Sequence, residues 1–254
     1  MHTITTLHQF IEFITDEKNK EEDLGNMSDF LFRGQNKDWD LIPKLVRLKL
    51  EGELKNIEAL MIEEFKRTSV PLSSLEPKND WDLIALAQHH GLPTRLLDWT
   101  YSAIVSLWFA VNETSPNPDK SSKENYGVVW LLKTQPDDFN IKVNDESPFS
   151  NENTKIFRPN IISQRISAQN GVFTVHKFIE NTPIIKHDVV QFNTHRGFKD
   201  RLIKIKIPHD SFPDLRDKLN IAGINASTVF PDIDGLCKHL EWRYSFYADE
   251  KNKS

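Results

Sequence analysis

The chain has 254 residues, of which 38% are hydrophobic, and it carries a net charge of −5 at neutral pH. This length and the 16 Phe and 6 Trp residues suit one domain with a large apolar core and exclude a disordered chain, while the acidic balance gives no overall signature of nucleic-acid binding. The single cysteine, Cys237, excludes an intramolecular disulfide, and the longest apolar run, around residues 103–111, is far shorter than the roughly 20 residues that span a bilayer, so we expect a cytoplasmic protein with no membrane role.

Apolar residues at helical spacing predict a first helix that begins at Thr5 or Thr6 and lies against the core. Residues 29–35 form a short apolar run halted by Gly34, which predicts a strand ending in a turn, with Arg33 at the strand end. Residues 53–68 predict a second helix, and a third runs from about residue 80 to Gly91.

Residues 94–100 predict a strand that enters a turn, and Ser102 then caps a buried helix through Val111. Further strands are predicted at 127–132, 171–178 and 201–207, a mobile loop at 140–154, a helix from 211 to Gly223, and a last helix opened by Pro231 and Asp232. Helices and strands interleave throughout. We therefore expect an α+β fold with a mixed, largely antiparallel central sheet flanked by helices.

Four ordered motifs distinguish the chain: Phe-Arg-Gly-Gln at 32–35, the polar stretch 88–100, Gln-Asn-Gly-Val-Phe-Thr at 169–174, and Phe-Pro-Asp-Ile-Asp-Gly at 230–235. Together they resemble the FRG family, which is named for a Phe/Tyr-Arg-Gly motif, over most of the chain. The resemblance implies a single FRG domain, residues 1–254, with its core at about 25–245.

The stretch 88–100 holds more donors and charges than a core segment can bury unpaired. Arg95 and Asp98 are three apart, so in a strand they point to opposite faces and are not expected to pair. Asp98 is instead the expected partner of Arg33, either as a structural ion pair or as an anchor that orients the guanidinium in a cleft. His89 and His90 are adjacent, which is poor geometry for a shared metal, and no metal is expected.

The order of the motifs is similar to the three-part NAD site of ADP-ribosyltransferases. The resemblance implies NAD as substrate, with Arg33, Gln169 and Asp234 as candidate catalytic residues. The implied NAD-binding residues are Arg33, Gly34, Gln35, His89, Thr94, Arg95, Asp98, Trp99 and Thr100.

Breaking the glycosidic bond of NAD generates an oxocarbenium-like ribose, so such a site needs a cation for the diphosphate, an aromatic wall for nicotinamide and a dipole or carboxylate near the ribose. Arg33 and Trp99 are the candidates for the first two parts. Gln169 is the first candidate for the third part and Asp234 the second, while Asp232 is expected to cap a helix. The enzyme class usually has Glu in the third motif, so Gln169 is a departure that leaves the general base unassigned.

The family resemblance also implies a toxin, a member of a toxin–antitoxin pair or an antiviral defence effector, with RNA, DNA or a protein as acceptor and an antitoxin as a possible partner. The basic segments 44–49 and 199–206 are interpreted as solvated surface, although either offers a local patch for nucleic acid. One alternative is a non-catalytic module that senses a nucleotide or a partner and signals through the loop 140–154. The other is a metal-dependent nuclease that uses Asp98, Asp232 and His89.

Overall fold

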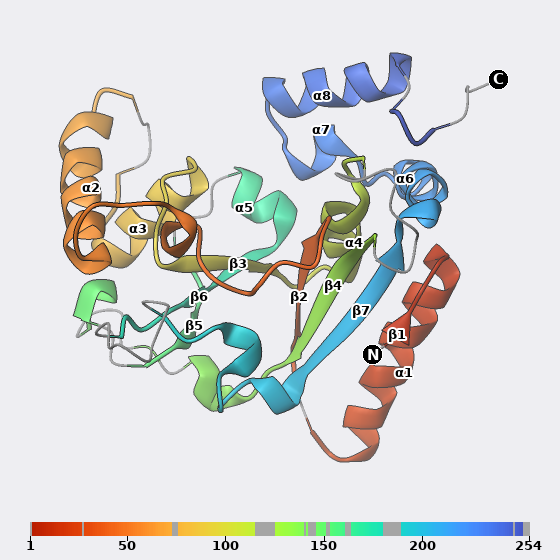
Figure 1. The fold of residues 1–254 in the computed structure, drawn as a ribbon, viewed down its shortest axis with the longest axis horizontal. Helices are drawn as coiled ribbons and strands as arrows, with labels where there is room; N and C mark the ends of the chain where they lie inside the picture. The colour runs from red at the N-terminus through yellow and green to blue at the C-terminus, as the bar shows by residue number, and fades with distance from the viewer. Residues whose placement is uncertain are drawn as a thin grey trace.

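The computed structural model describes residues 2–26, 28–72, 76–114, 125–139, 141, 146–150, 153–160, 164–179, 189–245 and 247–250. Seven strands form one sheet in the order β1-β7-β4-β2-β3-β6-β5, in which β1 runs parallel to β7 and the other neighbours are antiparallel (Figure 1). The strands are β1 (His2–Thr3), β2 (Phe30–Gln35), β3 (Leu96–Thr100), β4 (Tyr126–Lys133), β5 (Lys155–Phe157), β6 (Gly171–Val175) and β7 (Leu202–Pro208).

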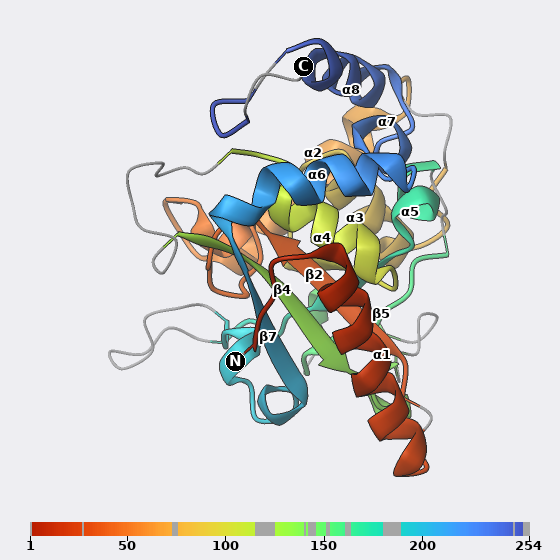
Figure 2. The ribbon, with the colours of Figure 1, turned by 90° about the vertical axis from the view of Figure 1, so that its right-hand side faces the viewer.

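The helices flank this sheet, which confirms the α+β prediction. They are α1 (Leu7–Asp23), α2 (Leu54–Ser69), α3 (Asp80–His89), α4 (Ala103–Val111), α5 (Gln164–Gln169), α6 (Phe212–Ile221), α7 (Ala226–Val229) and α8 (Ile233–Tyr244). Helices α7 and α8 lie at one end of the molecule, beyond α4 (Figures 1 and 2). None of the helices in the described part of the chain combines the length and apolar character that a membrane span requires.

Three apolar clusters hold the layers together. Helices α1, α4 and α6 pack on one face of the central strands through a cluster that includes Phe10, Leu107 and Phe212. The opposite face of β2, β3 and β4 packs against the segment that contains Phe192 and Phe198. A third cluster joins α2 and α3 to the β3–β6–β5 side of the sheet. The sheet is therefore buried on both faces near its centre, and its polar residues gather where strands end.

The first helix continues through a stretch of charged residues because the sheet supplies partners for them. Thr6 Oγ1 accepts a hydrogen bond from Gln9 N at the start of α1, which confirms a predicted cap. Near the helix end, Lys133 Nζ of β4 lies 2.9 Å from Glu17 and 2.8 Å from Glu21. Burial raises the pKa of Glu17, but hydrogen bonds from Lys20 and Lys133 outweigh it, and Lys133 likewise holds the pKa of Glu21 below the ordinary value.

Gly34 of the Phe-Arg-Gly motif is required by packing. A Cβ atom at this position would lie 1.8 Å from the carbonyl oxygen of Ser106 on α4, which is closer than any real contact. Only a residue without a side chain lets β2 approach α4 this closely. The motif glycine therefore sets the distance between the strand that carries Arg33 and the helix behind it.

His176, just after β6, makes the stability of the fold depend on pH. Its side chain is 0% exposed, and burial lowers its pKa to about 3. Thr174 Oγ1 accepts from Trp99 Nε1, so its own hydrogen is free to donate to His176 Nε2 at 3.2 Å, which favours the neutral imidazole.

Between the unfolded pKa of about 6.5 and the folded pKa of about 3, only the unfolded chain binds this proton, so stability falls as pH falls through that window. We expect the free energy of unfolding, measured by urea titration, to decline between pH 6 and 5 by about 1.4 kcal/mol per pH unit more in the native chain than in His176→Gln. Other histidines contribute equally to both proteins. Equal slopes would contradict a buried neutral His176.

Candidate active site

The sheet opens between β2 and β3. The two strands are in register only at Phe32 and Thr100, whereas β2 pairs with β4 along its whole length. Beyond that point Arg33 crosses the opening, and its Nη1 donates to the main-chain oxygen of Asp98 at 2.7 Å. The predicted strands thus bring the first and second motifs together, and the expected Arg33–Asp98 contact is made chiefly through the backbone.

A cavity of about 370 Å³ lies at this opening. It falls within the range of about 300–1,000 Å³ that is typical of small-molecule sites. Its walls come from β2, α3, β3, α4, α5, β6 and the segment before α8. The lining residues are Phe32, Arg33, Gly34, Gln88, His89, Gly91, Asp98, Trp99, Thr100, Phe109, Arg165, Gln169, Gly171, Phe173 and Phe230.

Two arginines line the cavity with unused donors. The Arg33 side chain is 17% exposed, and burial lowers its pKa although the neighbouring Asp98 opposes this effect. Arg165 Nη2 donates to Asp232 at 3.1 Å, and its guanidinium lies 4.5 Å from the centre of the Phe230 ring. The Nε atoms of both arginines are buried and find no hydrogen-bond partner among the described residues. Such donors suit an anionic ligand.

Asp98 carries the only carboxylate among the described residues that line the cavity. Its side chain is 57% exposed, and its two oxygens accept from Gln88 Nε2 at 3.2 and 3.1 Å. Gln88 is oriented in turn because its Oε1 accepts from Thr94 Oγ1 at 2.7 Å. The Arg33 Nη1 atom lies 3.7 Å from Asp98 Oδ2, which is a loose ion pair. The carboxylate is therefore positioned but still open to a ligand.

His89 places an uncharged imidazole beside the cavity. Burial lowers its pKa to about 4, and the nearby charges of His90 and Arg165 act in the same direction. The His89 and His90 rings contact each other edge to face, with centroids 4.8 Å apart. At neutral pH the ring is therefore uncharged, and an unprotonated ring nitrogen can accept a hydrogen bond from a ligand.

Gln169 reaches the cavity from a helix end. The sequence predicted a turn entering a strand at this position, but Gln169 is the last residue of α5, and Asn170 with a φ of 51° turns the chain into β6. Its main-chain oxygen accepts from Thr100 Oγ1 at 2.5 Å, and its Nε2 donates to Val229 O at 3.2 Å. The second and third motifs are thus linked directly.

Three residues that the resemblance assigned to NAD binding are instead parts of the core. Thr94 and Arg95 are 0% and 1% exposed, and Arg95 is paired with Glu58, its Nε and that carboxylate 2.6 Å apart. Gln35 is 5% exposed, and its Oε1 accepts from Trp130 Nε1. These side chains stabilise the fold and do not reach the cavity.

The expected roles of Trp99 and Asp234 are also not matched by their positions. Trp99 is among the residues that line the cavity, but its side chain is 3% exposed and its ring packs against Phe192, so little of the ring is open to a nicotinamide. Asp234 is exposed in the first turn of α8, outside the residues that line the cavity. Asp232 caps α8 as predicted, because its Oδ1 accepts from Gly235 N at 2.8 Å.

Sequence reasoning missed Arg165 and the aromatic walls Phe109 and Phe230 as site residues. Phe230 opens the fourth motif and Phe109 lies on the predicted buried helix, but nothing in the pattern indicated that they face a cavity. The nuclease alternative required Asp98, Asp232 and His89 to converge. Within the described residues, no three His, Cys, Asp or Glu side chains are grouped closely enough to hold a metal ion, and Asp232 pairs with Arg165.

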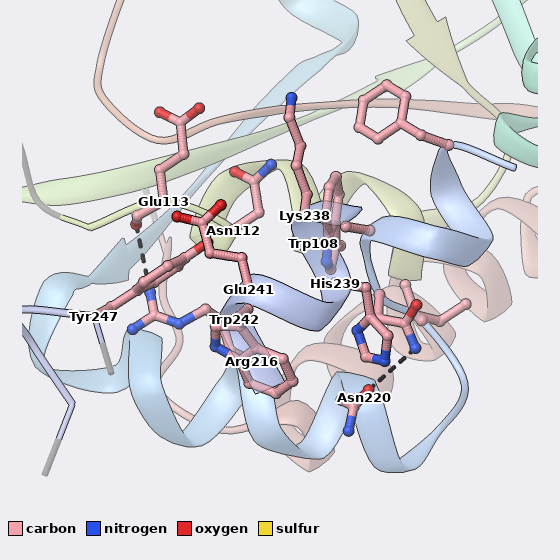
Figure 3. Close-up of a pocket in the computed structure, with 14 residues that line it drawn as sticks. Trp108, Asn112, Glu113, Arg216, Asn220, Lys238, His239, Glu241, Trp242 and Tyr247 are labelled. Carbon is pink, nitrogen blue, oxygen red and sulfur yellow. Dashed lines mark hydrogen bonds between the residues drawn. The ribbon is translucent and has the colours of Figure 1, made fainter. Parts of the chain in front are cut away.

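A second cavity, of about 240 Å³, lies between α4, α6 and α8 (Figure 3). Arg216 lines this cavity and is 3% exposed. Its guanidinium already donates to two carboxylates of the C-terminal segment, Asp249 at 2.5 Å and Glu250 at 2.9 Å. Arg216 Nη1 donates to Val111 O at 3.0 Å. Because the chain's own carboxylates neutralise this arginine, the second cavity is a weaker candidate for an anionic ligand.

Residues 28–119 match the family model of the FRG domain. The chain therefore carries an FRG domain, as the resemblance predicted, and the match includes the first two motifs but not those at 169–174 and 230–235. The matched segment contains the cavity residues from β2 to α4, among them Arg33, Asp98 and Phe109. The wall residues Arg165, Gln169, Gly171, Phe173 and Phe230 lie beyond it. No curated protein and no solved structure matches the chain.

Proposed function

We propose that the cavity between β2 and β3 binds NAD and that the protein is an ADP-ribosyltransferase. The observation that carries the proposal is the pair of cavity arginines, Arg33 and Arg165, whose buried Nε donors lack partners among the described residues. A diphosphate supplies the oxygens that such donors bind, and guanidinium groups recognise it through paired hydrogen bonds.

Aromatic walls next to these arginines suit the rings of the same ligand. Phe109 and Phe230 are partly buried, with centroids 5.9 Å apart and planes nearly perpendicular. Arg165 covers one side of Phe230, so the cation and the aromatic surface are adjacent. In this proposal the two phenylalanines replace Trp99 as the surface against which a nicotinamide or adenine ring packs.

Asp98 supplies the carboxylate that the chemistry needs. In the transfer, the bond between ribose C1′ and the nicotinamide nitrogen breaks, and nicotinamide leaves with the bonding electron pair. A nucleophilic oxygen or nitrogen of the acceptor forms the new bond to C1′ and releases its proton to solvent. Asp98 stabilises the positive charge that develops on the ribose, and Gln169 orients a ribose hydroxyl.

Asp98→Asn tests this assignment, because it keeps the shape and removes the charge. We expect nicotinamide release from NAD to fall by about 100-fold, in line with the loss of one group that stabilises a transition state, while the Kd for NAD changes by less than about threefold. Asp137→Asn, at an exposed position outside the cavity, is the matched control. Full activity of Asp98→Asn would contradict the role given to this carboxylate.

One observation favours a second function, a module that binds a nucleotide without turning it over. Gln169 stands where the enzyme class has Glu, and its amide nitrogen is already bonded to Val229 O. A sensor of this kind would bind NAD with the same arginines and release no nicotinamide. In the loop 140–154, through which signalling was expected, the structure describes residues 141, 146–150 and 153–154, and Pro148–Ser150 form a short 3-10 helix.

The biological role is also part of the proposal. The family resemblance suggests a toxin or antiviral defence effector that transfers ADP-ribose from NAD to RNA, DNA or protein, with an antitoxin as its partner. Its support is the site chemistry above, since a transferase site of this kind modifies whatever nucleophile reaches the ribose. The surface around the cavity determines which acceptor molecule can reach the ribose.

A further inference from the structure

Residues 36–49, between β2 and α2, form one rim of the cavity. This rim leaves β2 after Gln35, and its Leu41 oxygen accepts from Phe192 N at 3.0 Å. It then reaches the end of α3, where Lys44 Nζ donates to the main-chain oxygen of Gly91 at 3.0 Å. Gly91 lines the cavity. Figure 1 shows this orange segment crossing in front of β3 toward α3.

Exposed cations and an exposed indole follow one another along this rim. Lys37, Lys44 and Arg47 are exposed, and the Trp39 side chain is 44% exposed. Arg47 lies close enough to Arg33 for its charge to contribute to the lowered pKa of that guanidinium. The rim cations are therefore continuous with the cationic wall of the cavity.

The acidic residues of the rim are engaged elsewhere. Asp38 pairs with Lys204 on β7 and accepts from Tyr126 Oη, while Asp40 accepts from Gln191 Nε2 at 3.1 Å. Asp38 therefore neutralises Lys204 on β7 and not a cation of the rim. Residues 36–49 carry Lys37, Lys44, Arg47 and Lys49 against Asp38 and Asp40, a balance of +2, before Glu51 and Glu53 restore neutrality ahead of α2.

We propose that the acceptor is single-stranded nucleic acid, which the rim holds through Lys37, Lys44 and Arg47 on the phosphates and Trp39 under a base. Cations that follow a backbone, together with an aromatic platform for stacking, are the features that bind single strands without sequence preference. This inference rests on the proposed function. A nitrogen or oxygen nucleophile of the strand then attacks ribose C1′ as nicotinamide leaves, and its proton passes to solvent.

The test measures binding and transfer separately. A short fluorescent single-stranded RNA and a DNA of the same sequence are titrated against the protein over a range of NaCl concentrations. We expect Lys44→Ala/Arg47→Ala to weaken binding at least tenfold. The slope of the logarithm of the binding constant against the logarithm of the NaCl concentration should become shallower by about 1.4, or about 0.7 for each lost phosphate contact. Trp39→Ala is expected to weaken binding about tenfold through lost stacking.

The matched control is Lys177→Ala/Lys199→Ala, which removes the same charge from two exposed positions outside the rim. Lys177 lies just after the end of β6 and Lys199 just before the start of β7. This control variant should bind the oligonucleotide as the native chain does. The rim variants should bind NAD normally in calorimetry and should lose transfer of label from NAD to the strand.

Equal losses in the control and rim variants would overturn the inference, as would label that passes to protein and not to the strand. If the native chain binds the oligonucleotide through the rim but does not bind NAD, the binding surface stands and the proposed transferase function fails. If NAD is consumed but the strand is not bound, the transferase function stands and a nucleic-acid acceptor is excluded.

Discussion

Arg33→Ala is expected to lower the affinity for NAD by at least about 100-fold, because it removes the cation that faces the cavity with an unused buried donor. Loss of one partner from a desolvated charge pair costs about 2–5 kcal/mol, which corresponds to roughly 30-fold to several thousand-fold in affinity. Calorimetric titration of NAD into purified protein measures the change directly.

Two further variants separate charge, geometry and folding. Arg33→Lys keeps the charge but not the fork of donors, so its affinity should fall between those of the native chain and Arg33→Ala. Arg67→Ala, whose side chain is 73% exposed and pairs with Glu64 on the surface of α2, should bind NAD normally. Circular dichroism confirms that each variant is folded. Native affinity in a folded Arg33→Ala would contradict the assignment of Arg33 to the diphosphate.

Glu58→Ala is expected to lower the free energy of unfolding by about 3–5 kcal/mol, since it leaves a buried guanidinium without its counter-ion. Glu58 is 0% exposed, and its carboxylate accepts from Arg95 N at 2.7 Å and from Arg95 Nε at 2.6 Å. Arg95 is fixed further because its Nη1 donates to Pro148 O at 3.0 Å. This pair joins α2 to the start of β3.

The exposed pair of Arg67 and Glu64, on the same helix, is the matched control. Glu64→Ala removes the same type of side chain from the surface and should cost less than about 1 kcal/mol. Urea denaturation at neutral pH gives both values. If Glu58→Ala were as stable as Glu64→Ala, the Arg95–Glu58 pair would not be the structural link that its burial indicates. That result would support the earlier expectation that Arg95 binds NAD.

The elements with strong local signals were predictable, and the short ones were not. The cap Ser102 and the apolar run after it predicted α4, a continuous apolar segment predicted β4, and the alternation of Ile and Lys predicted β7. Strands β1 and β5 have two and three residues, and α7 has four, so no periodicity develops within them. These elements form because the sheet edge and neighbouring helices are already in place.

Strand alternation explains which predicted site residues were misplaced. Asp98 and Thr100 share one face of β3. Trp99 lies between them and also borders the cavity, but its side chain points to the other face and packs in the core. The buried partner of Arg95 lies 37 residues away in sequence, so its identity depends on how α2 packs. Arg165 likewise comes from a six-residue helix that tertiary contacts alone position.

The account rests on NAD occupying the cavity between β2 and β3, and titration of NAD into isotope-labelled protein, followed by NMR, tests this most directly. Gly34, Gly91 and Gly171 line the cavity from three different elements, whereas Gly25, Gly52 and Gly197 do not line it. We predict saturable shifts of the first three glycine amides, with the other three unchanged. An absence of shifts at saturating NAD, or shifts that avoid Gly34, Gly91 and Gly171, would contradict the proposed site.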